Sequence, residues 1–300
     1  MTRQRSPQAT VRLADLLEWG RGQLSRSGVP KQEANWLLEW VLGQDSLLFA
    51  PQDVGRRAVE TYRSAIAQRS KRIPLQHIMG TMNFRGLELK AGPGVFSTRP
   101  ETEFLVEHAL RVGSSLGGGP LTVVDLCAGS GAIGLAMATE LGGAEVWLVE
   151  NSAEALPYLR ANVFRHASGA AKVAEQSALN ALPELVGQVD LVVSNPPYVG
   201  LFDAPTQPEA QADPAVALYG GGEDGLVIPR GIVLRAYQLL RHGGFLVMEH
   251  GETQGEALRE HALAVGFAGV GTEEDLTGAP RFLVAQKAPE ARCAAESGGE

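Results

Sequence analysis

The chain has 300 residues, of which 44% are hydrophobic and 20% are charged, a size that predicts one large domain or two ordinary ones. No apolar run approaches the roughly 18 residues that a membrane-spanning helix needs. The polar start has no apolar stretch typical of a secretory signal. The only two cysteines, Cys127 and Cys293, do not make a disulfide framework, so we expect a cytoplasmic protein with no membrane association.

Charge is distributed unevenly along the chain. Residues 1–90 hold 14 Lys and Arg against 8 Asp and Glu, a net charge of +6, and since the whole chain carries −8, the remainder carries −14. Phosphate contacts need clustered cations, so this acidic remainder is a poor general surface for nucleic acid. For the basic segment two interpretations stay open, a surface for an acidic or RNA-associated partner or an ordinary solvated helical surface.

The first part of the chain has a helical pattern. Residues 11–72 carry apolar side chains at helical spacing, with breaks at Gly28, Pro30 and Pro51. We therefore predict a small helical domain over residues 1–80.

Residues 81–98 are expected to form a β-hairpin linker, because the sequence alternates partly and Gly86 and residues 92–94 supply turns. A helix start is predicted at residues 97–103. This segment offers a hydroxyl cap, a proline early in the first turn, and two glutamates where the helix dipole favours negative charge.

From residue 120 onward, apolar runs alternate with helical stretches. The predicted strands cover residues 121–126, 146–149, 190–193, 245–248 and 280–287, and the predicted helices lie around 132–141, 152–165 and 227–241. Such alternation predicts an α/β domain with a mostly parallel sheet and helices on both faces, here residues 99–287. Residues 288–300 are rich in Ala, Glu and Gly, and we expect a disordered tail.

A glycine-rich turn follows the first of these strands. Small residues there let the backbone approach a ligand, and the N–H groups of the next helix would face it. The second strand ends in Glu150, where a carboxylate can take both ribose hydroxyls of a nucleoside. Cys127 stands where a dinucleotide motif has its first glycine, which weakens that interpretation. A tight turn with no ligand is the alternative. Residues 125–131, Asp-Leu-Cys-Ala-Gly-Ser-Gly, resemble motif I of class I methyltransferases, which implies S-adenosylmethionine.

The most specific stretch is Asn-Pro-Pro-Tyr at residues 195–198, placed at the carboxyl end of a predicted buried strand. The two prolines bias the backbone toward an extended form and fix its carbonyls. The Asn195 side-chain oxygen and the Pro196 carbonyl can accept both N–H bonds of an amide or amino nitrogen, while Tyr198 packs on its planar face. This arrangement would direct the lone pair of a weakly nucleophilic nitrogen toward a sulfonium methyl group. The sequence indicates no catalytic base. A rigid loop without catalytic function is the alternative.

Other segments extend the likeness to about residues 10–287. The chain resembles the peptide chain release factor N5-glutamine methyltransferase family at residues 72–80, 84–87, 96–103, 195–198, 217–225, 249–251 and 275–281. The resemblance implies a class I (Rossmann-like) fold with a mostly parallel seven-stranded sheet, preceded by an N-terminal helical bundle and a β-hairpin. It also implies methyl transfer to the N5 amide nitrogen of the glutamine in the Gly-Gly-Gln loop of a release factor, which the bundle and hairpin help to hold.

The resemblance carries over to individual residues. The cofactor would be held by Cys127, Ala128, Gly129, Ser130, Gly131, Glu150 and Asn195. The glutamine would be gripped by Asn195, Pro196, Pro197 and Tyr198, and of these Asn195, Pro196 and Tyr198 are the expected catalytic residues. No metal is expected, because no His or Cys cluster has the spacing of metal ligands.

Three segments depart from the family pattern. Ser97 and Thr98 replace an aliphatic residue and a proline. Residues 176–180 lack the Asp that often contacts adenine, and Ser177 and Asn180 are the two candidate substitutes. Residues 212–215, Ala-Asp-Pro-Ala, replace the usual Glu-Pro pair.

Two other functions compete with this hypothesis. A nucleic-acid amino-methyltransferase, acting on adenine N6 or guanine N2, uses the same tetrapeptide, but it would be expected to carry a basic groove in or beside a catalytic domain that is acidic here. A cofactor-binding scaffold that has lost catalysis is the second alternative, against which the intact tetrapeptide argues.

Overall fold

The computed structural model describes residues 10–117, 119–167, 169–203 and 207–290. The chain divides into two compact units. A helical unit comprises Met1–Met82 together with Pro205–Ala212, and a catalytic unit comprises Asn83–Ala204 and Asp213–Glu300. The short segment that ends at Ala212 thus groups with the helices, although the sequence pattern assigned it to the second domain. Most of the expected C-terminal tail, residues 291–300, lies outside the described residues.

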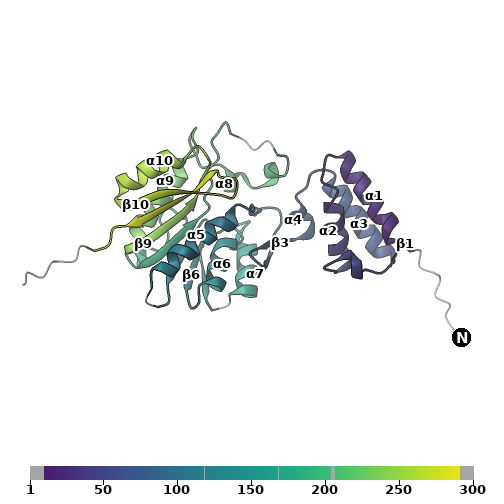
Figure 1. Cartoon of the computed structure of the whole chain (residues 1–300), viewed down its shortest axis with the longest axis horizontal. Helices are drawn as coiled ribbons and strands as arrows, with labels where there is room; N and C mark the ends of the chain where they lie inside the picture. The colour runs from purple at the N-terminus through teal and green to yellow at the C-terminus, as the bar shows by residue number, and fades with distance from the viewer. Residues whose placement is uncertain (1–9, 118, 168, 204–206, 291–300) are drawn as a thin grey trace, which may run out of the picture. The chain divides into compact units, whose positions relative to one another are not determined.

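In the helical unit, the long helices lie side by side (Figure 1). Its elements are β1 (Val11–Arg12), α1 (Leu13–Arg26), α2 (Glu33–Leu42), η1 (Leu47–Phe49), β2 (Asp53–Val54), α3 (Arg56–Arg69), α4 (Leu75–Met79) and, from the inserted segment, η3 (Ala210–Ala212). Tyr62 is fully buried among them and donates a hydrogen bond to the Ala34 carbonyl at 3.0 Å. A Cβ at Gly20 would lie 2.1 Å from the Tyr62 hydroxyl, so only glycine fits where α1 passes this ring.

A buried ion-pair cluster joins the inserted segment to the helices of the same unit. Arg69 is 4% exposed and pairs with Glu33 and, at 2.8 Å, with Glu209. Arg72 also pairs with Glu209 at 2.8 Å. The two arginines and two glutamates neutralise one another, which permits charges in a place where an unpaired one would be costly.

The predicted hairpin is present, but it is shorter than residues 81–98. Its strands are β3 (Thr81–Phe84) and β4 (Leu87–Lys90). The connecting residues Arg85 and Gly86 have φ of 45° and 77°, the two positive values that a tight two-residue hairpin turn requires.

In the catalytic unit, the described residues form a seven-stranded sheet in the order β10-β11-β9-β8-β5-β6-β7. Strand β11 is antiparallel to both neighbours, whereas β9, β8, β5, β6 and β7 run parallel. The strands are β5 (Thr122–Leu126), β6 (Glu145–Glu150), β7 (Ala171–Glu175), β8 (Val189–Ser194), β9 (Leu240–Glu249), β10 (Phe267–Glu274) and β11 (Pro280–Lys287). The remaining elements are α5 (Thr102–Ser115), α6 (Ala132–Glu140), α7 (Leu156–His166), η2 (Pro183–Leu185), α8 (Ala215–Leu218), α9 (Val227–Leu239) and α10 (Gly255–Val265). This architecture confirms the class I methyltransferase fold.

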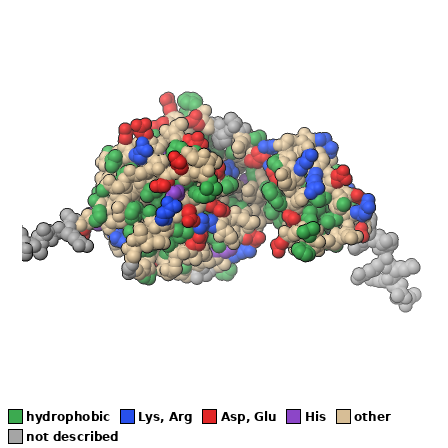
Figure 2. Space-filling model, in the orientation of Figure 1, with side chains coloured by type: hydrophobic (Ala, Val, Ile, Leu, Met, Phe, Trp, Pro, Cys, Tyr) green, Lys and Arg blue, Asp and Glu red, His purple; other side chains and the backbone are tan. Residues whose placement is uncertain are grey.

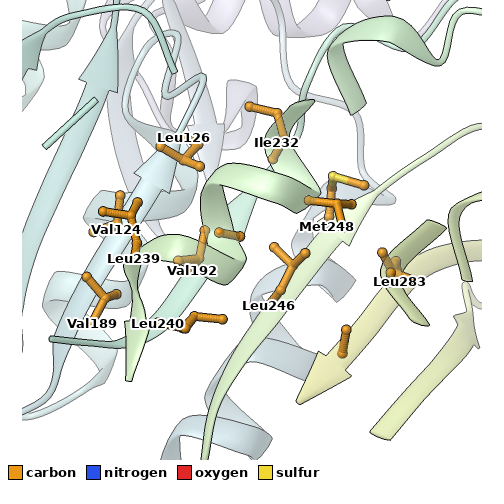
Figure 3. Packing of buried hydrophobic residues seen from close by; sticks show 14 of the residues in the cluster. Val124, Leu126, Val189, Val192, Ile232, Leu239, Leu240, Leu246, Met248 and Leu283 are labelled. Atoms are coloured by element: carbon orange, nitrogen blue, oxygen red, sulfur yellow. The ribbon is translucent and has the colours of Figure 1, made fainter. Parts of the chain in front are cut away.

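The core of this unit lies between the sheet and its helices. Figure 3 shows side chains of β5, β8 and β9 packed against α9. These central strands read as continuous apolar runs because both faces of a parallel sheet are covered. The labelled residues are Val124, Leu126, Val189, Val192, Ile232, Leu239, Leu240, Leu246, Met248 and Leu283.

A helix begins within residues 97–103 as predicted, but the predicted hydroxyl residue does not stand at its cap position. Helix α5 begins only at Thr102, and the side chain of Glu101, at its cap position, makes no capping hydrogen bond. The preceding residues have other partners, since the Ser97 N–H and the Arg99 guanidinium both bind the carboxylate of Asp213. A tertiary contact therefore decides the local structure here.

Two strands of the seven-stranded sheet, β7 and β10, had no counterpart in the periodicity prediction, and β9 begins at Leu240 rather than at residue 245. The short strands β1 and β2 of the helical unit were not predicted either. Among the helices of the described residues, none is both long and apolar enough to cross a membrane.

Candidate active site

The polar side chains of the site gather at one edge of the sheet. The carboxyl ends of parallel strands share an edge, and ligands bind there at the point where the strand order reverses. In this sheet that point lies between β5 and β8. The register pairs Leu126 with Ser194, whose hydroxyl donates to the Leu126 carbonyl at 2.6 Å. The glycine-rich turn after β5 and the Asn-Pro-Pro-Tyr segment after β8 therefore leave the sheet side by side.

The glycine-rich turn has an unusual backbone. Cys127, Gly129 and Gly131 all have positive φ, of 66°, 56° and 87°. A Cβ added at Gly129 would meet nothing within 4 Å, so the turn faces open space there, whereas one at Gly131 would lie 2.7 Å from Leu159. The turn is thus packed on one side and open on the other, next to the start of α6. A ligand that approaches the backbone closely would fit this open side.

Glu150 closes the turn from the end of β6. Its carboxylate is 9% exposed and accepts the Gly129 N–H at 2.7 Å and the N–H groups of Asn151 and Ser152 at 2.8 and 2.7 Å. The sequence predicted a ribose ligand at this position. The structure shows that this carboxylate also has a structural role, because its hydrogen bond with the Gly129 N–H fastens the turn to the strand end.

A second carboxylate lies beneath the turn. Asp125 is fully buried and accepts the Gly134 N–H at 2.8 Å through one oxygen, while its other oxygen has no hydrogen-bond partner among the described residues. Burial, with a smaller contribution from the charge of Glu150, raises the pKa of Asp125 to about 8. Burial also raises the pKa of the Cys127 thiol, and the charges of Glu150 and Asp125 add to the shift. The thiol therefore stays protonated and is no nucleophile.

These features fit S-adenosylmethionine. The open side of Gly129, the spare oxygen of Asp125 and the carboxylate of Glu150 provide space and polar groups for a nucleoside and an amino acid. After β7, Gln176 is already engaged, since its side-chain oxygen accepts the Leu182 N–H at 2.8 Å. Ser177 is half-buried and Asn180 is exposed at the same edge.

Two structural contacts hold the Asn-Pro-Pro-Tyr backbone in place. Gln254 donates to the Tyr198 carbonyl at 2.7 Å and to the Asp224 carbonyl at 2.8 Å. A Cβ at Gly225 would lie 2.2 Å from the Tyr198 carbonyl oxygen, so the loop at residues 220–225 packs directly on this backbone. The loop needs glycine for that approach and also for the φ of +70° at Gly225.

The side chains of the tetrapeptide join a buried carboxylate to which sequence reasoning gave no role. Glu249, at the end of β9, is 2% exposed. It accepts a hydrogen bond from the Thr102 hydroxyl at 2.9 Å and another from the Tyr198 hydroxyl at 3.1 Å. Asn195 in turn donates through Nδ2 to the Thr102 oxygen at 3.3 Å. Three separate segments of the catalytic unit thus converge on one network.

Burial is the main influence on the acidity of this network. It raises the pKa of Glu249 to about 7, although the hydrogen bonds from Thr102 and Tyr198 and the positive charge of Arg281 act in the opposite direction. The pKa of Tyr198 is also raised, by burial first and then by the charge of Glu249. Tyr198 therefore remains a neutral hydroxyl that donates its proton.

The structure also explains a departure from the family pattern. Asp213, which stands where a Glu-Pro pair is usual, is 5% exposed and binds Arg99 at 2.6 Å and the Ser97 N–H at 3.2 Å. Arg99 lies over the ring of Phe96 at 5.1 Å. Asp213 has a shorter side chain than Glu, but its carboxylate still holds the Ser97 backbone and the Arg99 side chain in place.

The hairpin is tied to the glycine-rich turn by Asn162 of α7. This fully buried side chain accepts the Lys90 N–H at 2.6 Å and donates to the carbonyls of Lys90 and Ser130 at 3.2 and 2.9 Å. Nothing in the sequence pattern singled it out.

The fold, the glycine-rich turn and the tetrapeptide define an S-adenosylmethionine-dependent methyltransferase. The family model "Methyltransferase small domain" matches residues 86–208, and the family model "PrmC N-terminal domain" matches residues 15–80. A solved methyltransferase from Pyrococcus furiosus shares the fold, with a TM-score of 0.50 and 19% identity over 78% of this chain and 98% of that one.

The particular family follows from curated relatives. The release factor glutamine methyltransferase of Bifidobacterium longum is 41% identical over 91% of this chain and 99% of its own length. That of Mycolicibacterium smegmatis is 42% identical over 92% and 98%. The chain belongs to the release factor glutamine methyltransferase family.

Proposed function

We propose that this chain methylates the N5 amide nitrogen of the glutamine in the Gly-Gly-Gln loop of a peptide chain release factor. The observation that carries the proposal is the Asn-Pro-Pro-Tyr segment at the switch point of the sheet, with Asn195 held through its Nδ2. That geometry offers carbonyl acceptors to a group with two N–H bonds. A primary amide has these two bonds, and the names of the relatives indicate a glutamine.

S-adenosylmethionine, when bound, supplies an electrophilic methyl group whose sulfur keeps the bonding electron pair as the carbon–nitrogen bond forms. The residues of the chain orient the acceptor. The Asn195 side-chain oxygen and the Pro196 carbonyl accept its two N–H bonds, and the Tyr198 ring packs against its plane. Their dipoles meet the positive charge that grows on nitrogen, and the rigid backbone holds the lone pair in line. The proton that nitrogen loses passes to water.

For the cofactor we propose the turn and strand-end residues already described. Glu150 would take the ribose hydroxyls, and Ser177 or Asn180 would contact adenine after β7. The remaining contacts are proposed for Cys127, Ala128, Gly129, Ser130, Gly131 and Asn195.

For the helical unit we propose recognition of the release factor. Its match to a dedicated N-terminal family domain and its large exposed apolar side chains support this role. Leu48 and Phe49 are 89% and 82% exposed, and Trp36 is 51% exposed. On the face of this unit seen in Figure 2, apolar and basic side chains both reach the surface.

Nucleic acid is the less favoured substrate. Residues 91–300 carry a net charge of −14, which opposes a phosphate backbone, and the curated relatives cited above are named for a protein substrate.

The test is single-turnover transfer of labelled methyl to a release factor, to DNA and to RNA side by side, with mass spectrometry locating the methyl group. We expect transfer to the Gly-Gly-Gln glutamine alone. Asn195→Ala removes a proposed catalytic contact, and this variant should lower the rate by ~10²–10³, the usual effect of losing one preorganised contact. A methyl group on nucleic acid, or on Lys or Arg of the factor, would refute the substrate.

A further inference from the structure

The proposed methyl transfer gives no role to Glu249 or Thr102. Both residues are buried, at 2% and 0% exposure, and they lie beside the side chains of Asn195 and Tyr198. The Thr102 oxygen lies 2.9 Å from one carboxylate oxygen of Glu249 and 3.3 Å from Asn195 Nδ2. The other carboxylate oxygen lies 3.1 Å from the Tyr198 hydroxyl.

The direction of these hydrogen bonds is fixed by the carboxylate. An ionised Glu249 has no proton to give, so it can only accept. Thr102 has a single hydroxyl proton, and a charge-assisted bond to the carboxylate is the stronger use for it. The Thr102 oxygen must then accept from its other neighbour, Asn195.

Asn195 has one donor end and one acceptor end, and their assignment decides whether it can bind an amide N–H. Because the donor end is directed to Thr102, the side-chain oxygen Oδ1 is the end that remains for the substrate. A rotation of this amide by 180° would present N–H to N–H.

We infer that Glu249 and Thr102 are positioning residues, which set the hydrogen-bond polarity of Asn195 so that its oxygen faces the N–H of the methyl acceptor. Glu249 also holds Tyr198 against the plane of that acceptor. The inference rests on the proposed amide chemistry, but it concerns residues that would act in the same way on an amino group.

Glu249, Thr102 and Asn195 form a hydrogen-bond relay, and the test removes the Thr102 hydroxyl from it without changing the shape of the side chain. Thr102→Val should slow single-turnover methyl transfer by about 10- to 100-fold, the scale of a misplaced catalytic group. The Kd for S-adenosylmethionine and the KM for the release factor should stay within about threefold, because kcat alone reports the orientation. Thr102→Ser, which restores the hydroxyl, should recover most of the lost rate.

A double-mutant cycle separates this role from simple structural support. If Thr102 acts through Asn195, then Thr102→Val should add almost nothing in an Asn195→Ala background. The matched control is Thr139→Val on α6, whose hydroxyl binds only helix carbonyls and whose loss should leave the rate unchanged. Glu249→Gln provides the same comparison at the other end of the relay, should Thr102→Val fail to fold.

Two results would overturn the inference. One is a Thr102→Val enzyme within threefold of the wild-type rate, and the other is a double variant whose loss equals the product of the two single losses. The cycle can be measured on whichever substrate the wild-type enzyme methylates. A wild-type enzyme that methylates RNA would therefore refute the release factor as substrate and still leave the relay testable.

Discussion

Glu249 is the residue on whose ionisation the proposed hydrogen-bond directions depend. Its neighbours from the elements packed around it are Arg281 of β11, Glu101 before α5, and the hydroxyls of Thr102 and Tyr198. Burial outweighs Arg281, so the pKa of Glu249 is raised to about 7. Protonation removes one acceptor and supplies a donor, which disrupts the bond directions around Thr102 and Asn195.

We therefore expect kcat to rise with pH through about 7, because a raised carboxyl pKa means that the ionised form is lost as pH falls through that value. The measurement is single-turnover transfer between pH 5.5 and 9 at saturating cofactor. Glu249→Gln should be slower and should lose this pH dependence. A variant with the same rising profile as the wild-type enzyme would assign the ionisation to another group.

Glu150 is expected to serve both the turn and the cofactor. Glu150→Ala removes an acceptor from three backbone N–H groups and from the ribose, so affinity for S-adenosylmethionine should fall by ~1–3 kcal/mol. Calorimetric titration measures it. Glu145→Ala, at the opposite end of the same strand and paired with Lys172, is the control that should bind normally. Unchanged affinity in Glu150→Ala would remove this residue from the proposed site.

At the scale of elements, the ion-pair cluster of the helical unit stabilises α3 and the inserted segment. Arg69→Met would leave Glu33 buried without its cation, and breaking such a pair costs about 3–5 kcal/mol. Denaturant unfolding followed by tryptophan fluorescence reports this unit, since three of the four tryptophans, Trp19, Trp36 and Trp40, lie in it.

Arg56→Met is the matched control on the same helix. Arg56 and Glu60 form an exposed i,i+4 pair, whose loss should leave the transition in place. Equal behaviour of the two variants would mean that the buried cluster contributes nothing to stability.

Element prediction succeeded where periodicity was strong and failed where packing decided. The central strands β5 and β8 are almost wholly buried and mostly apolar, so their runs were evident. Edge strands β7 and β10 mix exposed and buried residues, which left no clear pattern. The start of α5 looked capped by a hydroxyl in sequence, but the helix begins at Thr102, and Asp213, over a hundred residues away, binds the Ser97 N–H and the Arg99 guanidinium before it.

At the scale of the whole molecule, we expect the helical unit to determine affinity for the full release factor and the catalytic unit to determine the chemistry. Leu48→Ser with Phe49→Ser should raise KM for the factor by tenfold or more, since exposed apolar anchors often dominate an interface. Both side chains are exposed, so folding should be unaffected.

Transfer to a short peptide that contains Gly-Gly-Gln provides the internal comparison, and we expect no change there. The matched surface control is Leu263→Ser on α10, an apolar residue that is 55% exposed. An unchanged KM for the factor in the double variant would show that the binding surface lies elsewhere.

The sequence by itself determined the class of fold, the positions of the turn at residues 127–131 and of the tetrapeptide at residues 195–198, and the family that the comparisons then confirmed. Such local motifs can be read directly because the residues that form them are contiguous. Only the tertiary structure brought Glu249, Thr102 and Asn195 together, fastened Glu150 to Gly129, and assigned residues 207–212 to the helical unit through Glu209. These contacts join residues far apart in the chain, and hydrogen bonds of that kind leave no periodic signal in the sequence.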